Sequence, residues 1–280
     1  MDKQIIDLFI KNAVAEDLGD GDHTSLSTIP ADALGQAKLI IKEDGILAGV
    51  ELALQIFEFI DSNLTVGVLM QDGEAVKYGD IALTVSGNTR SILLAERLVL
   101  NCMQRMSGIA SKTHSIVKLL DGYKTQLLDT RKTTPGLRYI EKWAVRIGGG
   151  VNHRIGLYDM ILIKDNHVDY AGGIANAIHA ANQYLRVNGK QLQIEIEVRN
   201  LSELSTVLLT GNVDRIMLDN FEIADLKDAV KLIDGRFITE ASGGITETNI
   251  VNYAACGVDF ISMGALTHSV KSLDMSLKAF

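Results

Sequence analysis

The second half of the chain repeats one pattern, a short apolar run followed by a stretch with helical spacing of its apolar residues. Alternation at this spacing predicts parallel strands joined by right-handed helical crossovers. Because a glycine-rich dinucleotide fingerprint does not follow the first strand, the pattern favours a closed or nearly closed β/α barrel over an open doubly wound sheet. The six apolar runs are TQLLDT, DMILIK, LQIEIEV, DRIMLD, RFITEA and VDFISMG, and the helical stretches between them cover 135–148, 169–187, 201–210, 222–233 and 246–256.

The first half of the chain has a different organisation. Apolar spacing predicts a helix over 3–18, and from 35 to 87 strands closed by Asp-Gly turns flank another helix. The stretch 90–120 is apolar and helical, with a break expected near Ser107 and Gly108. We therefore expect an α/β protein with an N-terminal α+β sandwich domain over 1–105 and a barrel over 106–268, with a C-terminal helix over 269–280 packing back on the first domain.

Polar residues follow the predicted strands at the point where each strand ends. The carboxyl ends of barrel strands form one rim, and active sites of β/α barrels lie on that rim. Each residue taken alone is weak evidence, but six positions on one edge predict a site there. These positions are Asp129 to Lys132, Lys164 to His167, Glu197, Asp219 with Asn220, Ser242 to Gly244, and Gly264 with Ala265.

Positive charge is concentrated in one segment of an acidic protein. The chain has a formal net charge of −8, yet residues 129–167 hold seven Lys or Arg against four Asp or Glu. Guanidinium groups bind carboxylates or phosphates bidentately, and ammonium groups act as point charges. Surface salt bridges are the alternative for any one residue, but the whole set predicts a pocket for a ligand with several negative charges. Its members are Arg131, Lys132, His153, Arg154 and Lys164.

Acidic residues form a second group on the predicted rim. Glu197 and Asp219 end two strands, and Glu195 lies two positions before Glu197, so both glutamates face the same side of their strand. Carboxylates placed together at a rim are typical of an Mg²⁺ site or of contacts to sugar hydroxyls. Simple ion pairing with neighbouring Arg or Lys remains an alternative, most of all for Glu195.

Glycines end the last two predicted strands, in EASGGIT and ISMGALT. Small residues at these positions let backbone N–H groups approach a phosphate, and barrels often hold phosphate there.

In the helix expected after Pro135, three basic residues follow one another at intervals of four, and we interpret them as a solvent-exposed or interface face of the helix. These residues are Arg138, Lys142 and Arg146.

Composition excludes several classes of protein. A pI near 5.3 disfavours a nucleic-acid binder. The two cysteines, Cys102 and Cys256, form no paired motif and fit a reducing compartment. Neither a signal peptide nor an apolar run of 18 residues is found, so we expect a cytoplasmic protein without membrane or nucleic-acid partners.

Six ordered motifs together resemble one family. DTRKTTPGLR, GGGVNHRIGLYDMILIKDNH, IEIEVRN, IMLDNF, EASGGI and ISMGALTHS are similar to those of quinolinate phosphoribosyltransferases, also called carboxylating nicotinate-nucleotide pyrophosphorylases. The resemblance runs from about residue 16 to about residue 270. It implies a barrel of six or seven strands, and transfer of phosphoribosyl from phosphoribosyl pyrophosphate to quinolinate with decarboxylation, a step of NAD biosynthesis.

The resemblance also implies roles for individual residues. The five cationic residues would hold the quinolinate carboxylates and the sugar diphosphate, with Lys132 or Lys164 assisting decarboxylation. Glu197 and Asp219 match an acidic pair near the ribose and Mg²⁺, with contact to the metal direct or indirect. Ser242 to Gly244 and Gly264 with Ala265 match 5′-phosphate loops. Arg97 matches an arginine that a partner subunit inserts, which implies a homodimer with shared sites or a higher assembly.

Three rival interpretations remain at this point. A paralogous group associated with molybdenum uptake shares the barrel, but its position matching Lys164 is typically apolar and its NHR triplet is altered. A nicotinate phosphoribosyltransferase that does not decarboxylate binds one carboxylate, for which five cations are excessive. A non-catalytic anion sensor needs no acidic pair. The departures from the family pattern, His23 and Arg199, lie outside the core set.

Overall fold

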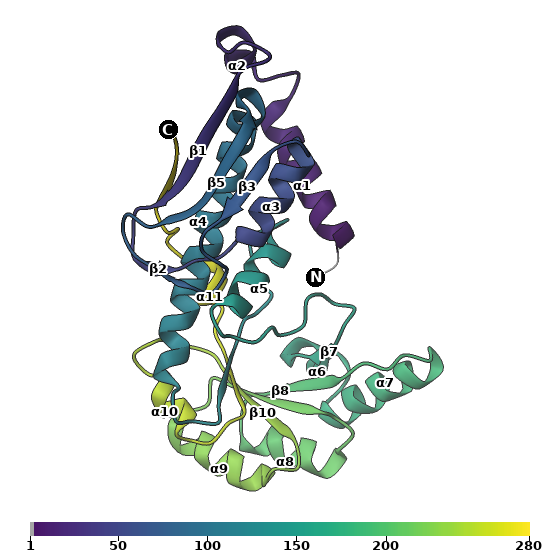
Figure 1. Cartoon of the computed structure of the whole chain (residues 1–280). Helices are drawn as coiled ribbons and strands as arrows, with labels where there is room; N and C mark the ends of the chain where they lie inside the picture. Colours follow the sequence, from purple (N-terminus) through teal and green to yellow (C-terminus); the bar gives the residue numbers. More distant parts are fainter. Residues whose placement is uncertain (1–2) are drawn as a thin grey trace. The chain divides into compact units, whose positions relative to one another are not determined.

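The computed structural model describes residues 3–280, which form two compact units (Figure 1). Unit 1 comprises the chain up to His114 together with Thr133–Gly149 and Leu266–Phe280, and unit 2 comprises Ser115–Lys132 and Gly150–Ala265. This division differs from the expected boundaries of 1–105 and 106–268, because the segment around 133–149 groups with the N-terminal residues. No helix within residues 3–280 is long and apolar enough to cross a membrane.

Unit 1 is built on an antiparallel sheet with the strand order β12-β1-β5-β3. Buried Leu39, Ile41, Leu83 and Val85 give β1 and β5 one apolar face. A second, two-stranded sheet pairs β2 with β4. The elements of this part of the chain are α1 (Lys3–Leu18), α2 (His23–Thr28), β1 (Leu34–Ile41), β2 (Gly45–Ile46), α3 (Val50–Ile60), β3 (Thr65–Val68), β4 (Ala75–Val76), β5 (Ile81–Asn88), α4 (Thr89–Leu119), α5 (Arg138–Ile147) and β12 (Met275–Ala279).

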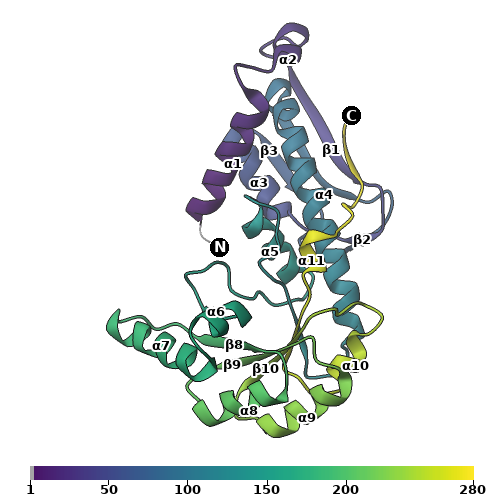
Figure 2. The ribbon, with the colours of Figure 1, turned by 180° about the vertical axis from the view of Figure 1, so that it is seen from behind.

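The C-terminal segment is a strand, and the helix expected over 269–280 was wrong. β12 pairs antiparallel with β1, with Leu277 opposite Leu39, and Figures 1 and 2 both show the chain end running along β1. Met275 and Leu277 are buried while Ser276 between them is less so. That alternation has the period of a strand, and an unpaired edge of β1 supplies the partner.

Helix α4 is continuous through Ser107 and Gly108, where a break was expected. A Cβ atom at Gly108 would lie 2.2 Å from the backbone oxygen of Lys271. The Ser107 hydroxyl lies 2.8 Å from the backbone N of Ala48, whose N–H it accepts. The close approach of other backbone segments to the helix therefore accounts for a serine at 107 and a glycine at 108. Neither residue interrupts the helix.

Helix α5 is buried on more sides than its sequence indicates. Lys142 is 1% exposed, so the expected solvent-exposed or interface face is wrong at that position. The neighbouring Glu141 is also buried and forms an ion pair with Arg105 of α4 at 2.8 Å. A buried charge needs a partner close by, and the sequence of α5 alone does not contain the partner of Glu141.

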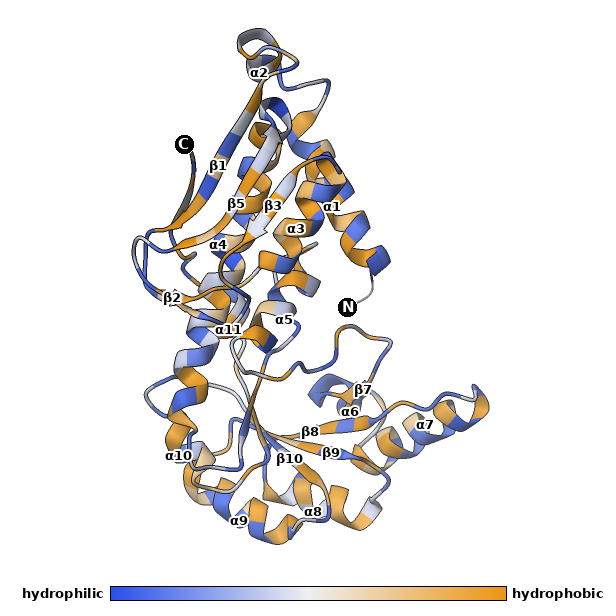
Figure 3. Cartoon of the chain, in the orientation of Figure 1, coloured by the Kyte–Doolittle hydropathy of each residue, from blue (hydrophilic) through white to orange (hydrophobic). Residues whose placement is uncertain are grey.

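Unit 2 contains a parallel sheet of six strands in the order β6-β11-β10-β9-β8-β7. This order, with helices between successive strands, confirms the predicted β/α barrel fold. In Figure 3 the strands β8 and β9 are largely hydrophobic, whereas α8 and α9 carry both kinds of residue. The elements are β6 (Gln126–Leu128), β7 (Ile161–Ile163), α6 (Asp165–Tyr170), α7 (Ile174–Val187), β8 (Ile194–Val198), α8 (Leu201–Thr210), β9 (Arg215–Asp219), α9 (Ile223–Ile233), β10 (Ile238–Ser242), α10 (Ile250–Ala254) and β11 (Phe260–Ser262). Helix α11 (Ala265–His268) begins at the last residue of unit 2, and its other residues belong to unit 1.

Candidate active site

A cavity of about 520 Å³ opens at the carboxyl ends of the unit 2 strands. Its volume lies within the range of roughly 300–1,000 Å³ that is usual for small-molecule sites. A larger cavity of about 830 Å³ lies in unit 1, but it does not include any residue of the predicted site. Ten predicted site residues line the smaller cavity: Arg131, Lys132, His153, Arg154, Lys164, Glu197, Asp219, Ser242, Gly243 and Gly244.

Strand register brings the acidic residues and the glycine turn to one edge. Asp219 is the last residue of β9 and pairs directly with Ser242, the last residue of β10. Glu197 of β8 pairs with Met217 of β9. Because neighbouring parallel strands end together, residues far apart in the sequence meet at this rim.

Arg154 is the most enclosed of the arginine and lysine side chains in the cavity. It is 9% exposed, and its Nη1 donates a hydrogen bond to the backbone oxygen of Met160 at 3.1 Å. Burial and the nearby charge of Arg131 both lower the pKa of Arg154. Two guanidinium groups in proximity repel each other, and an anion between them removes that repulsion. The arrangement suits a carboxylate or phosphate ligand.

The two acidic residues on the rim are only partly compensated by positive charge. Burial, followed by the charge of Asp219, raises the pKa of Glu197. Burial also raises the pKa of Asp219, although a hydrogen bond from Asn220 at 2.6 Å opposes that shift. Lys164 Nζ lies 3.7 Å from Glu197 Oε2. The ionised forms of Glu197 and Asp219 are therefore unfavourable in this environment, and a further cation near the two carboxylates would stabilise them.

The turn after β10 depends on glycine at one position. Gly243 has a φ of +92°, and a Cβ atom there would lie 2.3 Å from Asn220 Oδ1. The backbone N–H of Asn220 donates to the Ser242 oxygen at 2.8 Å. Asn220 therefore connects the glycine turn to Asp219, which places a small-residue turn next to the acidic pair.

His153 is fixed from several directions. Its backbone N–H donates to Asp129 Oδ1 at 2.9 Å, and its ring Nε2 lies 2.8 Å from Glu195 Oε2.

Glu240 of β10 also lines the cavity and was missed by the sequence reasoning. The sequence contained a signal for Glu240, because it lies two positions before the predicted site residue Ser242 and therefore faces the same side of the strand.

Three predicted residues do not line this cavity. Gly264 and Ala265 follow β11, and Ala265 begins α11. Arg97 belongs to unit 1, where it lines a separate cavity of about 480 Å³ together with Arg105, Glu16 and Asp17. The suggested roles of these three residues remain predictions.

Comparison with known proteins supports the assignment that the residues suggest. The family model described as "Quinolinate phosphoribosyl transferase, C-terminal domain" matches residues 109–278, and the corresponding N-terminal domain model matches residues 22–107. The chain belongs to the quinolinate phosphoribosyl transferase family. This membership confirms the resemblance seen in the six motifs.

Relatives and solved structures of this family resemble the chain over nearly its whole length. A chloroplastic carboxylating nicotinate-nucleotide pyrophosphorylase of Arabidopsis thaliana is 49% identical, covering 96% of this chain and 81% of that protein. The crystal structure of NadC from Streptococcus pyogenes has a TM-score of 0.93 at 38% identity, covering 99% and 97%. The nicotinate-nucleotide pyrophosphorylase from Francisella tularensis has a TM-score of 0.92 at 41% identity, covering 100% and 98%.

Proposed function

We propose that this chain transfers ribose 5-phosphate from phosphoribosyl pyrophosphate to the pyridine nitrogen of quinolinate, with loss of carbon dioxide. The products are nicotinate mononucleotide and pyrophosphate, in de novo NAD biosynthesis. The observation that carries this proposal is the lining of one cavity by five cationic side chains, an acidic pair and a glycine turn. A pyridine diacid and a sugar bearing phosphate and pyrophosphate require that combination of charges.

The cationic side chains bind and orient the two substrates. Buried Arg154, close to Arg131, presents a guanidinium that suits bidentate contact with a carboxylate. Lys132, Lys164 and His153 supply further positive charge around the same space. Ser242 to Gly244 offer small residues for the 5′-phosphate, and we extend this role to Gly264 and Ala265 by family resemblance.

The acidic pair stabilises the ribose carbon during transfer. As pyrophosphate departs, that carbon develops oxocarbenium character and positive charge. Glu197 and Asp219 both line the cavity and both carry carboxylates. Fixed negative charge placed where positive charge develops lowers the barrier, because it needs no reorganisation during the reaction.

Mg²⁺ is the cofactor that we propose for this site. The raised pKa values of Glu197 and Asp219 indicate that the two carboxylates lack sufficient positive charge. Carboxylate oxygens are the ligands that Mg²⁺ prefers, commonly with retained water molecules. The residues present therefore fit the ion, which when bound would neutralise the leaving pyrophosphate.

Decarboxylation follows from the charge of the ribosylated ring. Once the ring nitrogen carries ribose it is positive, and it stabilises the electron pair that remains on the adjacent carbon when the carboxylate leaves as carbon dioxide. That carbon then takes a proton. We propose Lys132 or Lys164 as the group that assists, and both lie near the acidic pair, where their charges act on Asp219.

We further propose a homodimer with shared sites and a cytoplasmic location. The dimer proposal rests on the family resemblance of Arg97, and the location on the two free cysteines, which fit a reducing compartment. One relative is chloroplastic and another is mitochondrial, so the location varies in this family.

A direct assay tests the reaction. Purified protein with quinolinate, phosphoribosyl pyrophosphate and Mg²⁺ should lose quinolinate absorbance and release pyrophosphate and carbon dioxide in equal amounts. Nicotinate in place of quinolinate should react much more slowly, because it offers one carboxylate. Binding of quinolinate without turnover would instead favour an anion sensor, and failure of both would leave the molybdenum-associated paralogues as the better assignment.

A further inference from the structure

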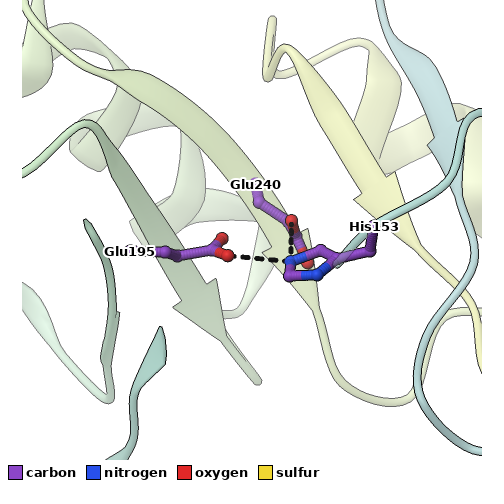
Figure 4. A group of neighbouring side chains, drawn as sticks. All are labelled: His153, Glu195 and Glu240. Atoms are coloured by element: carbon purple, nitrogen blue, oxygen red, sulfur yellow. Dashed lines mark hydrogen bonds and ion pairs between the residues drawn. The ribbon is translucent and has the colours of Figure 1, made fainter. Parts of the chain in front are cut away.

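A largely buried group of four charged or titratable side chains lies beside the cavity, and only His153 among them has a part in the proposed reaction. It consists of His153, Glu195 of β8, Glu240 of β10 and Arg215 of β9; three of them appear in Figure 4. His153 and Glu240 line the cavity, whereas Glu195 and Arg215 do not. The group therefore connects the cavity wall to the interior of the unit.

The histidine ring is held by both carboxylates. Nε2 of His153 lies 2.8 Å from Glu195 Oε2 and 3.5 Å from Glu240 Oε2, and Figure 4 shows the ring nitrogen between the two. Arg215 Nη1 lies 3.2 Å from Glu240 Oε2, and its Nε lies 4.0 Å from Glu195 Oε1. Glu195 and Glu240 are both 0% exposed.

The charges of this group do not balance unless the histidine contributes. Within the group, two buried carboxylates face the single guanidinium of Arg215, and Oε1 of each glutamate lacks a hydrogen-bond partner. The charge of Arg154, which lies outside the group, also acts on Glu195. An uncompensated charge in a protein interior is strongly unfavourable. A positive imidazolium completes the balance, and the hydrogen bonds to Glu195 and Glu240 outweigh the effect of burial and raise the pKa of His153 to about 9.

One hydrogen bond in the structure opposes protonation of the second ring nitrogen of His153. The backbone N–H of Arg154 donates to Nδ1 of His153 at 2.8 Å, which requires a nitrogen without a proton. A proton on Nδ1 would displace that contact, and an anion in the cavity could accept the new N–H. The other charged groups near the ring are Asp129, which accepts the His153 backbone N–H, and Arg154, whose charge acts on Glu195 and on Arg131.

We propose that Glu195 and Glu240 are positioning residues that hold His153 in its charged imidazolium form at the cavity wall when an anion is bound, with Arg215 as their second counter-ion. This inference rests on the proposed function, because quinolinate is the anion. A metal ion is a weaker explanation for the group. The ligand atoms of His153, Glu195 and Glu240 lie within 4.8 Å of one another, but Arg215 already supplies positive charge to both carboxylates.

Quinolinate affinity measured against pH tests the proposal without turnover. The charged ring exists below its pKa, so wild-type affinity should persist to about pH 9 and fall above it. In Glu240→Gln and in Glu195→Gln the fall should begin about one unit or more lower, since one stabilising carboxylate is lost. Glu240→Asp keeps the charge and should restore most of the range. His153→Gln should lack this phase of the fall.

A matched control separates this effect from general destabilisation. Asp259 accepts from the hydroxyl of Thr239, next to Glu240 in β10, and pairs with Lys124 at 2.9 Å, but it does not line the cavity. Asp259→Asn should lower thermal stability and leave the pH of the affinity fall unchanged. An unaltered pH profile in both glutamine variants would overturn the proposal, because the cluster proton would then reside on a carboxylate and the ring would be neutral.

A spectroscopic measurement on the unaltered protein makes the proposal independent of variant folding. The chain has six histidines, so the ring nitrogens can be labelled selectively and His153 assigned by comparison with His153→Gln. With saturating quinolinate at pH 8, both ring nitrogens of His153 should show the shifts of an imidazolium. A neutral ring under those conditions would contradict the inference, whereas an absence of quinolinate binding at every pH would refute the proposed function itself.

Discussion

Arg154 shows how the environment of one side chain decides its use. The residue is 9% exposed, yet within residues 3–280 its guanidinium forms no ion pair closer than 4.0 Å. The guanidinium of Arg154 is positioned by the hydrogen bond that it donates to the backbone oxygen of Met160. A buried guanidinium that is positioned by a neutral acceptor keeps its charge available for a ligand.

Replacing Arg154 by alanine should weaken quinolinate binding by about 10- to 100-fold, the loss expected for hydrogen bonds to a charged group. Calorimetric titration with quinolinate measures the change. Arg186→Ala, which alters an exposed arginine of α7, is the matched control and should bind normally. A folded Arg154→Ala protein with wild-type affinity would refute the binding role.

Glu197→Gln should separate activity from stability. We expect kcat to fall by about 10²- to 10³-fold, as when a group that stabilises the transition state is removed. The raised pKa of Glu197 means that its ionised form opposes folding above the ordinary carboxyl pKa and that this penalty disappears in acid. The melting temperature at pH 7 should therefore rise by about one to three degrees.

Thermal unfolding at two pH values and a control variant test the prediction for Glu197→Gln. Thermal unfolding at pH 7 and at pH 4 should show a difference between Glu197→Gln and wild type only at the higher pH. Glu247→Gln alters an exposed carboxylate and should change neither stability nor kcat. Retention of full activity in Glu197→Gln would exclude the carboxylate from the transfer step.

At the scale of elements, the ends of β9 and β10 form one structural unit. Asp219 and Ser242 are opposite each other in the register, and Asn220 bonds to both segments. The turn at Gly243 has a positive φ and lies against Asn220, so its backbone conformation and the position of Asp219 depend on each other. A change in the turn should therefore affect the acidic pair as well as phosphate binding.

Alanine at Gly243 and at Gly244 should have different effects. Both positions have positive φ, which costs an alanine about 1–2 kcal/mol, but only at Gly243 would the new Cβ atom collide with Asn220. Overpacking adds about 1–3 kcal/mol. The KM for phosphoribosyl pyrophosphate and kcat should suffer at least tenfold more in Gly243→Ala than in Gly244→Ala, and equal effects would argue against the coupling to Asn220.

At the scale of the whole molecule, the proposed dimer gives Arg97 a role outside its own subunit. Arg97→Ala and Lys164→Ala should each be inactive alone. Mixed and allowed to exchange subunits, they should recover about a quarter of wild-type activity, because about half the dimers are mixed and each has one intact site of two. Recovery is measured by pyrophosphate release. No recovery in subunits shown to exchange would contradict a shared site.

The local repeat of strand and helix could be predicted because its periodicity is carried by consecutive residues. The helices at 3–18 and 201–210 were predicted with the observed boundaries for the same reason. The rim residues followed from topology, since parallel strands that end together bring their next residues to one edge. Ten predicted residues therefore line the cavity.

Other features depend on a partner that is remote in the sequence. The C-terminal strand exists because β1 offers it an edge, and Gly108 is required because Lys271 approaches the helix there. The buried contact of His153 with Glu195 and Glu240 joins three segments that no local pattern relates. Sequence alone determined the barrel, its family and the charge of its site, since periodicity and residue type are local properties. Only the tertiary structure decided which charges are buried together, because burial depends on what packs against a residue from elsewhere in the chain.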